Sequence, residues 1–144
     1  MAMEGQKIFD NQCVACYLDE SIPVLQHRWL CRPTNEEFKE NLLNMLDIYK
    51  YQKEKYPDLK WLADTTLMGE ITQDTEDWLA NEWDKLLFDE AGVKVHAVVL
   101  SSDLFSDYPM EVFQRKSEQK HVDQGVHLGV FASLDSAHEW MKQY

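Results

Sequence analysis

The sequence predicts one α/β domain, built on a mixed sheet with an N-terminal antiparallel meander, further parallel strands and about four helices. Short extended runs fill residues 7–31, and helical and extended runs alternate from residue 34 onward. No repeat, linker or low-complexity tract divides the 144 residues. Such a length suits one hydrophobic core, and the alternation favours right-handed crossovers between parallel strands. We expect the domain to span residues 1–144, with residues 1–6 as a disordered leader.

Three strands are expected first. Lys7–Asp10 and Gln12–Leu18 flank the pair Asp10-Asn11, which favours a tight turn. A second break, DESIP at residues 19–23, is followed by the extended run Val24–Cys31 (VLQHRWLC). Together these runs predict an antiparallel meander.

A helix is predicted from Thr34. Thr34-Asn35-Glu36-Glu37 has the pattern of a capping box, in which a threonine hydroxyl and a glutamate carboxylate each accept an amide of the first turn. Pro57 ends the helix. Its inward face is read from apolar residues at helical spacing, which are Phe38, Leu42, Met45, Leu46 and Tyr49.

The next two elements are a strand and a second helix. Leu59–Asp64 (LKWLAD) is a short apolar run between breakers, which predicts a buried strand, and a polar loop follows over residues 64–72. Thr72 or Asp74 is expected to cap the second helix, and Gly92 to occupy the position after it. Its inward stripe is Leu79, Trp83, Leu86 and Leu87.

The C-terminal part repeats the alternation. Val93–Leu100 (VKVHAVVL) is expected to be a strand covered on both faces. A polar helix over residues 109–120 should begin at Pro109, and Val126–Phe131 (VHLGVF) should form the last strand. Ser133 then caps a final helix whose inward residues are Leu134, Ala137, Trp140 and Met141.

Composition restricts the classes of partner. The chain has 26 acidic and 14 basic residues and a net charge of −12, so it repels phosphate backbones and is not expected to bind nucleic acid. No run of about 18 apolar residues is present, so no membrane span is predicted. The start lacks the pattern of a signal peptide, and an odd number of cysteines argues against a disulfide framework. We therefore expect a cytoplasmic protein.

Cys13-x-x-Cys16 raises the question of a haem or a metal. The residue after Cys16 is Tyr17 rather than the histidine that c-type haem requires. Zinc pairs lie on tight turns, whereas residues three apart in a strand point to opposite faces, and no second ligand pair follows. We expect no cofactor and no metal site, and we interpret these cysteines as small buried thiols.

Several motifs together resemble those of bacterial SpoIIAA-like proteins, an uncharacterised branch of the STAS superfamily. They are Trp29, the helix start Thr34–Phe38, Leu62-Ala63-Asp64 before Met68-Gly69, the strand VKVHAVVL and the ending VFASLDSAHEWM. The resemblance covers nearly the whole chain from Lys7. It implies a STAS-like fold.

The resemblance also implies a regulatory role. STAS domains of the anti-sigma-antagonist type bind protein partners and are switched by phosphorylation of a serine in the loop after a central strand. The matching stretch here is Asp64-Thr65-Thr66-Leu67-Met68-Gly69, in which two threonines stand near the place of the serine. A phosphorylation switch would therefore use Thr65 or Thr66.

Polar residues also gather where two parallel strands end, and ligands bind at that edge in open α/β sheets. The expected partner- or ligand-binding residues are Asp64, Thr65, Thr66, Met68, Ser101, Ser102 and Asp103. No phosphate-binding glycine loop and no pairing of a nucleophile with a base occurs in the sequence, so no catalytic residue is assigned.

The leading functional prediction is a non-catalytic, cytoplasmic interaction or regulatory module that binds a protein partner or a second copy. The acidic second helix and the basic segment Arg115–His121 are candidate docking surfaces for two copies. A carrier or sensor of a small apolar ligand is the alternative, and an enzyme of unknown reaction is the second alternative.

Overall fold

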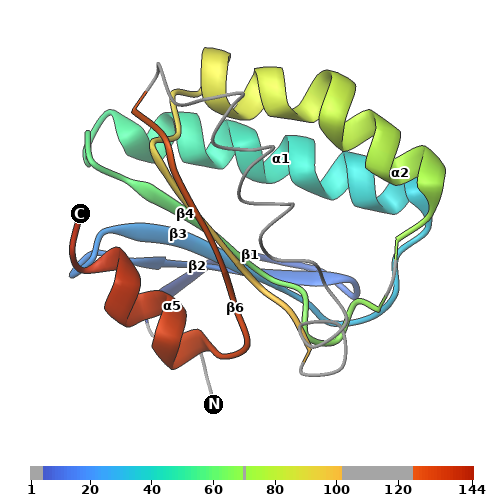
Figure 1. Ribbon diagram of the computed structural model, residues 1–144, viewed down its shortest axis with the longest axis horizontal. Helices are drawn as coiled ribbons and strands as arrows, with labels where there is room; N and C mark the ends of the chain where they lie inside the picture. The colour runs from blue at the N-terminus through green and yellow to red at the C-terminus, as the bar shows by residue number, and fades with distance from the viewer. Residues whose placement is uncertain (1–4, 70, 102–124) are drawn as a thin grey trace.

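A six-stranded sheet forms the centre of the protein, with its strands in the order β1-β2-β3-β4-β5-β6 (Figure 1). The computed structural model describes residues 5–69, 71–101 and 125–144. Pairing is antiparallel from β1 to β3 and parallel from β3 to β6, so the expected mixed sheet is confirmed. The strands are β1 Gln6–Asp10, β2 Val14–Asp19, β3 Val24–Trp29, β4 Lys60–Asp64, β5 Val95–Val99 and β6 His127–Phe131.

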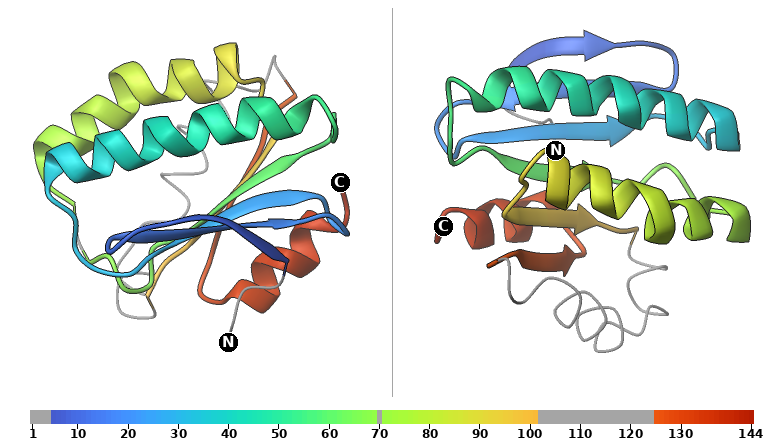
Figure 2. Two further views of the ribbon diagram at one scale, coloured as in Figure 1. Left: turned by 180° about the vertical axis from the view of Figure 1, so that it is seen from behind. Right: turned by 90° about the horizontal axis from the view of Figure 1, so that it is seen from above.

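Helices cover both faces of this sheet. Helix α1 (Asn35–Lys53) follows β3, a second long helix over residues 73–90 follows β4, and α5 (Leu134–Met141) follows β6. The first two lie side by side on one face and α5 lies on the other (Figure 2). The shared face of α1 and the second helix is expected, because parallel crossovers of one hand that advance in one direction, from β3 to β4 to β5, place their helices on the same face.

The number of helices and the start of the first strand differ from the expectation. The described residues form three helices rather than about four, and the helix expected over residues 109–120 lies outside them. The basic segment Arg115–His121 also lies outside them. At the N-terminal end, Gln6 already pairs with Leu18 in the sheet, so the first strand begins one residue earlier than expected.

Each helix start is fixed by a hydroxyl group, as the sequence predicts. The Thr34 hydroxyl accepts the Glu37 amide at 3.1 Å, and the Glu37 carboxylate accepts the Thr34 amide at 3.0 Å, which completes the capping box. Thr72 rather than Asp74 caps the second helix, through the Thr75 amide at 3.2 Å. Ser133 caps α5 in the same way.

The second helix departs from the α-helical register that its apolar spacing predicts. It starts as α2 (Gln73–Trp78) and continues as two π-helical segments, η1 (Leu79–Trp83) and η2 (Lys85–Glu90). A π-helix bonds residues five apart, so side chains at that spacing come close together. Accordingly, the rings of Trp78 and Trp83 stack, with centroids 5.7 Å apart. Gly92 follows with a φ of 71°, as expected at the end of a helix.

The sheet separates two hydrophobic clusters. The larger one fills the space under α1 and the second helix, and its centre is made of Trp29, Trp61, Tyr49 and Met45. The smaller one lies under α5 and contains Leu62, Ala97, Ala137 and Met141 among its buried residues. Alternate residues of the parallel strands supply the two clusters, as a sheet covered on both faces requires.

A histidine lies inside the larger cluster. His27 of β3 is 1% exposed and packs edge-on against the rings of Trp29 and Trp61. Among the residues that the structure describes, no group bonds to its Nε2 atom. Burial, together with the neighbouring His96, lowers the pKa of His27 from 6.5 to about 3, although Asp64 acts in the opposite direction. His27 is therefore neutral in the folded protein near neutral pH.

This burial makes folding sensitive to mild acid. Below pH 6.5 the unfolded chain binds a proton at His27 that the folded chain does not accept until the pH approaches 3. The free energy of unfolding should therefore fall with decreasing pH across that window, by up to about 1.4 kcal/mol per pH unit. Urea unfolding at a series of pH values measures this slope. His27→Leu should flatten it; a slope unchanged by His27→Leu would contradict the assignment.

Candidate functional site

The predicted site lies where β3, β4 and β5 end, and an ion pair occupies its centre. Arg28 of β3 and Asp64 of β4 are neighbours in the parallel register, and Arg28 Nε lies 2.8 Å from Asp64 Oδ2. The Asp64 side chain is 1% exposed, whereas that of Arg28 is 27% exposed. The arginine thus covers the carboxylate and leaves little of it for an external ligand.

The two threonines after Asp64 are bound into the same edge. The Thr65 hydroxyl donates to the Val99 carbonyl oxygen at 2.7 Å, and the Thr65 side chain is buried. Thr66 is exposed, but its amide donates to Asp64 Oδ1 at 3.0 Å and its hydroxyl bonds to the same oxygen. Bonds of this kind are what such residues form in turns, so they stabilise the end of β4.

The remaining predicted residues do not join this group of polar contacts. Met68 is 6% exposed and belongs to the larger hydrophobic cluster, and its amide bonds to the Thr65 carbonyl oxygen at 3.1 Å. Ser101, just after β5, is partly buried. Ser102 and Asp103 lie outside the described residues. The structure therefore brings Asp64, Thr65 and Thr66 together with Arg28, a partner that the sequence analysis missed.

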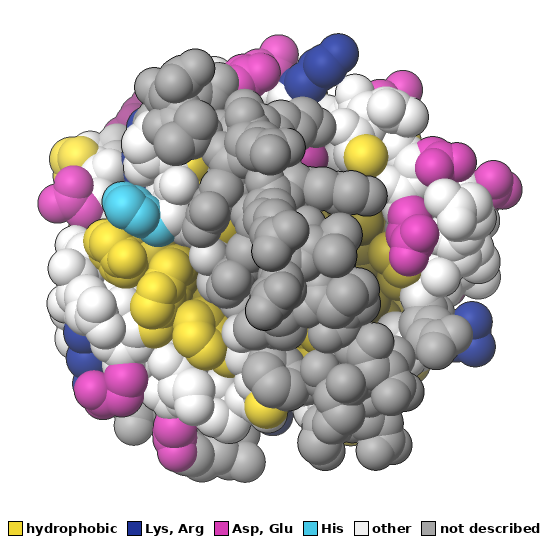
Figure 3. Space-filling model, in the orientation of Figure 1, with side chains coloured by type: hydrophobic (Ala, Val, Ile, Leu, Met, Phe, Trp, Pro, Cys, Tyr) yellow, Lys and Arg dark blue, Asp and Glu magenta, His cyan; other side chains and the backbone are white. Residues whose placement is uncertain are grey.

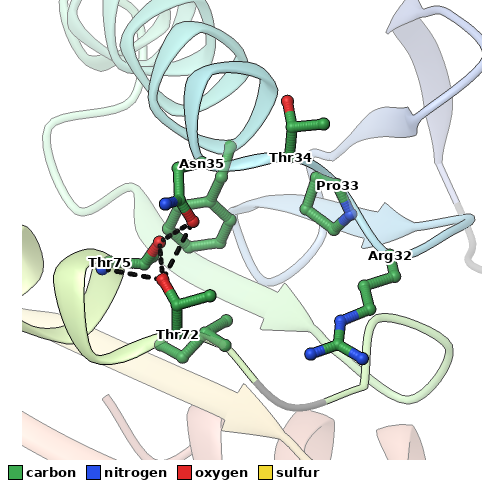
Figure 4. Close-up of a pocket in the computed structure, with 8 residues that line it drawn as sticks. Arg32, Pro33, Thr34, Asn35, Thr72 and Thr75 are labelled. Atoms are coloured by element: carbon green, nitrogen blue, oxygen red, sulfur yellow. Dashed lines mark hydrogen bonds between the residues drawn. The ribbon is translucent and has the colours of Figure 1, made fainter.

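A small pocket lies beside this edge, between the first turns of α1 and α2 (Figure 4). Asn35 Oδ1 accepts hydrogen bonds from the hydroxyls of Thr72 at 2.9 Å and Thr75 at 2.6 Å, and these bonds close one side. The cavity volume is about 20 Å³, which is room for about one water molecule. It is lined by Arg32, Pro33, Thr34, Asn35, Phe38, Ile71, Thr72 and Thr75.

A second cavity of about 100 Å³ lies at the opposite edge, where β4 and β5 begin, and three lysines line it. Lys53 Nζ donates to the carbonyl oxygens of Ala91, at 3.2 Å, and Gly92. Lys60 Nζ donates to the Ile22 carbonyl oxygen at 3.1 Å. Burial lowers the pKa of both lysines. Because these ammonium groups bind carbonyl oxygens at the end of the second helix and near the start of β3, they hold local structure.

Cys13 and Cys16 are both buried free thiols, as the sequence analysis expected, but Cys13 has a contact that the analysis missed. Cys16 is fully buried in the larger cluster, where burial raises its pKa to about 12. Cys13 contacts Cys31, with 3.3 Å between the two sulfurs. The sequence analysis missed this pair, which joins the start of β2 to the segment after β3. Within the described part of the chain, no group of three or more potential metal ligands occurs.

Aromatic side chains form a partly exposed strip along β6 and α5. Phe131 packs on Trp140 at 5.3 Å between ring centroids, Trp140 on Tyr144 at 5.2 Å, and Tyr144 stacks on His127 at 4.3 Å. Tyr144 is 47% exposed and His127 is exposed. Figure 3 shows hydrophobic side chains gathered beside a histidine on this side of the molecule. We call these four residues the aromatic strip.

The position of Trp140 confirms its expected inward direction in part. Trp140 packs against the smaller cluster, but its side chain is only partly buried. The inward positions of α5 are taken by Leu134, Ala137 and Met141, which pack on the sheet. Trp140 lies at the flank of that face, where it covers Phe131 near the edge strand and leaves part of its ring in solvent.

Comparison with known proteins gives no family. No protein-family model, no curated protein and no solved structure matches the chain. The resemblance to the STAS superfamily therefore stays a prediction. Over the residues described here, no helix has both the length and the apolar character needed to cross a bilayer.

The ion pair at the end of β4 should contribute strongly to stability. In Asp64→Asn the arginine loses its charged partner at a buried position, so we expect the free energy of unfolding to fall by about 2–4 kcal/mol. Chemical denaturation measures the change. Asp10→Asn is the matched control, because it removes the exposed Lys7–Asp10 ion pair and should leave the free energy of unfolding almost unchanged. Equal losses in the two variants would contradict this reading.

Proposed function

We propose that the chain is a non-catalytic protein-interaction module that docks its partner through the aromatic strip. The observation that carries this proposal is the continuous series of ring contacts from Phe131 through Trp140 and Tyr144 to His127, which lies partly in solvent. Exposed apolar patches mark interaction sites, and tryptophan and tyrosine are enriched among the residues that dominate binding energies.

The geometry of the strip supports a protein partner. The rings pack against one another, so they are held in place before binding and lose little side-chain freedom when a partner covers them.

Net charge decides between kinds of partner. Two copies of a chain with a net charge of −12 repel each other, so self-association is disfavoured at low salt. The exposed acidic residues Asp135 and Glu139 lie on α5, the helix that carries Trp140. A basic or uncharged partner surface therefore fits this region better than a second copy does.

The alternative functions have weaker support. The two cavities described above, of about 20 and 100 Å³, fall below the ~300 Å³ at which small-molecule pockets begin. At the expected site the polar groups of Asp64, Thr65 and Thr66 bond to one another or to the chain. No described residue there pairs a nucleophile with a base, so an enzymatic reaction has no observation in its favour.

Regulation by phosphorylation, which the resemblance implies, would fall on one threonine. Thr66 is exposed, whereas Thr65 is buried and its hydroxyl is bound to the Val99 carbonyl oxygen. A kinase can reach Thr66 without opening the sheet. A phosphate on Thr66 would lie beside the Asp64 carboxylate, which repels it, and near the Arg28 guanidinium, which attracts it. Phosphorylation would therefore weaken the ion pair between Arg28 and Asp64.

The proposal predicts a partner whose capture depends on the strip. A tagged full chain is used to recover proteins from a lysate of the source cells, in parallel with His127→Ser/Tyr144→Ser. Loss of a hot-spot aromatic costs about 2 kcal/mol, so recovery and measured affinity should fall about 30-fold in this variant. The matched control is Tyr51→Ser, which removes a tyrosine that is 60% exposed on α1, and it should bind normally.

Two results would overturn the proposal. One is equal recovery of the same partner by the strip variant and the unmodified chain. The other is the absence of any strip-dependent partner together with concentration-dependent dimers in sedimentation experiments, because the strip would then join two copies instead.

A further inference from the structure

We propose that Cys13 and Cys31 form a reversible disulfide when the protein meets a hydroperoxide, so that the start of β2 is a thiol-modification site. The two sulfurs lie 3.3 Å apart and both cysteines are free thiols. The residues are 18 positions apart in sequence, so the contact is made by the fold. This inference is independent of partner docking at the aromatic strip.

The backbone on both sides of the pair is already fixed. The Leu30 amide donates to the Cys13 carbonyl oxygen at 2.8 Å, which continues the β2–β3 ladder up to the residue before Cys31. The Cys13 amide donates to Asn11 Oδ1 at 2.8 Å. A disulfide requires two cysteines on closely spaced backbone with their side chains directed at each other. The strand pairing next to Cys13 and Cys31 meets the first requirement, and the sulfur contact meets the second.

A second connection ties this corner to α1. Asn11 Nδ2 donates to Asn41 Oδ1 at 2.8 Å, and Asn41 Nδ2 in turn donates to the Glu37 carbonyl oxygen at 2.8 Å. Asn41 is 6% exposed, so its part of this chain of bonds is shielded from water, whereas Asn11 is exposed. The position of Cys13 is therefore held by the strand pairing and by a helix, and the sulfurs do not need a large rearrangement to react.

The two thiols differ in access, which gives the reaction an order. Cys31 is exposed and meets an oxidant first, whereas Cys13 is 5% exposed. Burial, reinforced by the hydrogen bond with Cys31, raises the pKa of Cys13 to about 12. Cys13 is therefore expected to react slowly with an external oxidant, and the sulfur that it already contacts, that of Cys31, is its accessible reaction partner.

The chemistry has two balanced steps. The Cys31 sulfur attacks one oxygen of the hydroperoxide, the O–O bond breaks, and the leaving oxygen takes the thiol proton, which leaves a sulfenic acid on Cys31. The Cys13 sulfur then attacks the Cys31 sulfur, the S–O bond breaks, and the hydroxide released takes the Cys13 proton as water. The two thiols lose two electrons and two protons, and hydrogen peroxide becomes two molecules of water.

Cys16 provides an internal comparison. It is fully buried beneath α1, and burial alone raises its pKa to about 12. Among the described residues, the only sulfur–sulfur contact joins Cys13 to Cys31, so Cys16 has no second thiol with which to react. Oxidation should therefore consume Cys13 and Cys31 and leave Cys16 as a thiol.

The bond would join β2 to the segment that leads into the capping box at Thr34. It would cross-link residues that are 18 apart and so restrict the unfolded chain more than the folded one. The oxidised protein is therefore expected to melt at a higher temperature than the reduced protein. Arg32, one residue after Cys31, lines the small pocket between α1 and α2, so the bond would lie next to that pocket.

The test uses the full chain treated with hydrogen peroxide under non-reducing conditions. Free thiols should fall from three to one per chain, and the intact mass should fall by two hydrogen atoms. Peptide mapping should recover one cross-linked pair that contains Cys13 and Cys31, and dithiothreitol should restore all three thiols. The rate of closure should rise with pH, because Cys13 must lose its proton.

Two variants are the controls. Cys31→Ser, at an exposed position, should keep its two remaining thiols under the same treatment, whereas Cys16→Ala should lose both of its remaining thiols. The proposal is overturned if the unmodified chain keeps three thiols, if Cys31 cross-links two chains, or if Cys31 is oxidised further while Cys13 stays free. Circular dichroism of each variant confirms that these readings come from folded protein.

Discussion

The packing of one tryptophan, Trp61, holds α1 and the second helix against the sheet. Trp61 of β4 is 1% exposed, and its ring contacts His27 of β3, Tyr49 of α1 and Trp83 of η1, with centroids 5.5, 5.6 and 5.7 Å away. Tyr49 also donates its hydroxyl to the Leu59 carbonyl oxygen at 2.6 Å, one residue before the strand that carries Trp61. Aromatic rings bury large areas and favour such edge-on contacts, so a single side chain holds two helices on the same face of the sheet.

Most of the fold could be predicted because local chemistry determines it. The capping hydroxyls of Thr34 and Ser133 mark helix starts within a few residues, and period-two or helical spacing identifies the elements between them. The π-helical register of residues 79–90 was not predictable in the same way. The π-helical register accompanies the stacking of Trp78 on Trp83. The apolar spacing of this segment fits an ordinary α-helix equally well. The sequential strand order likewise follows from packing rather than from any single segment.

The site was predictable only in part, for a related reason. Asp64, Thr65 and Thr66 were identified because polar residues after a buried strand collect at the sheet edge. The groups that complete each contact come from other strands, and their register cannot be read from sequence spacing. Arg28 meets Asp64 only through the parallel register of β3 and β4. Cys31 is 18 residues from Cys13, and no sequence spacing links the two.

The arrangement separates the two surface features that carry the proposals. The thiol pair lies at β2 and β3, whereas the aromatic strip lies along β6, and the strand order places four strand spacings between β2 and β6. Adjacent strands lie about 4.8 Å apart, so that distance is about 19 Å across the sheet. The packed layers around Trp61 fill the space between them and resist gradual deformation. Oxidation of the thiols should therefore change the free energy of unfolding of the whole domain. It should not change the shape of the aromatic strip that a partner contacts.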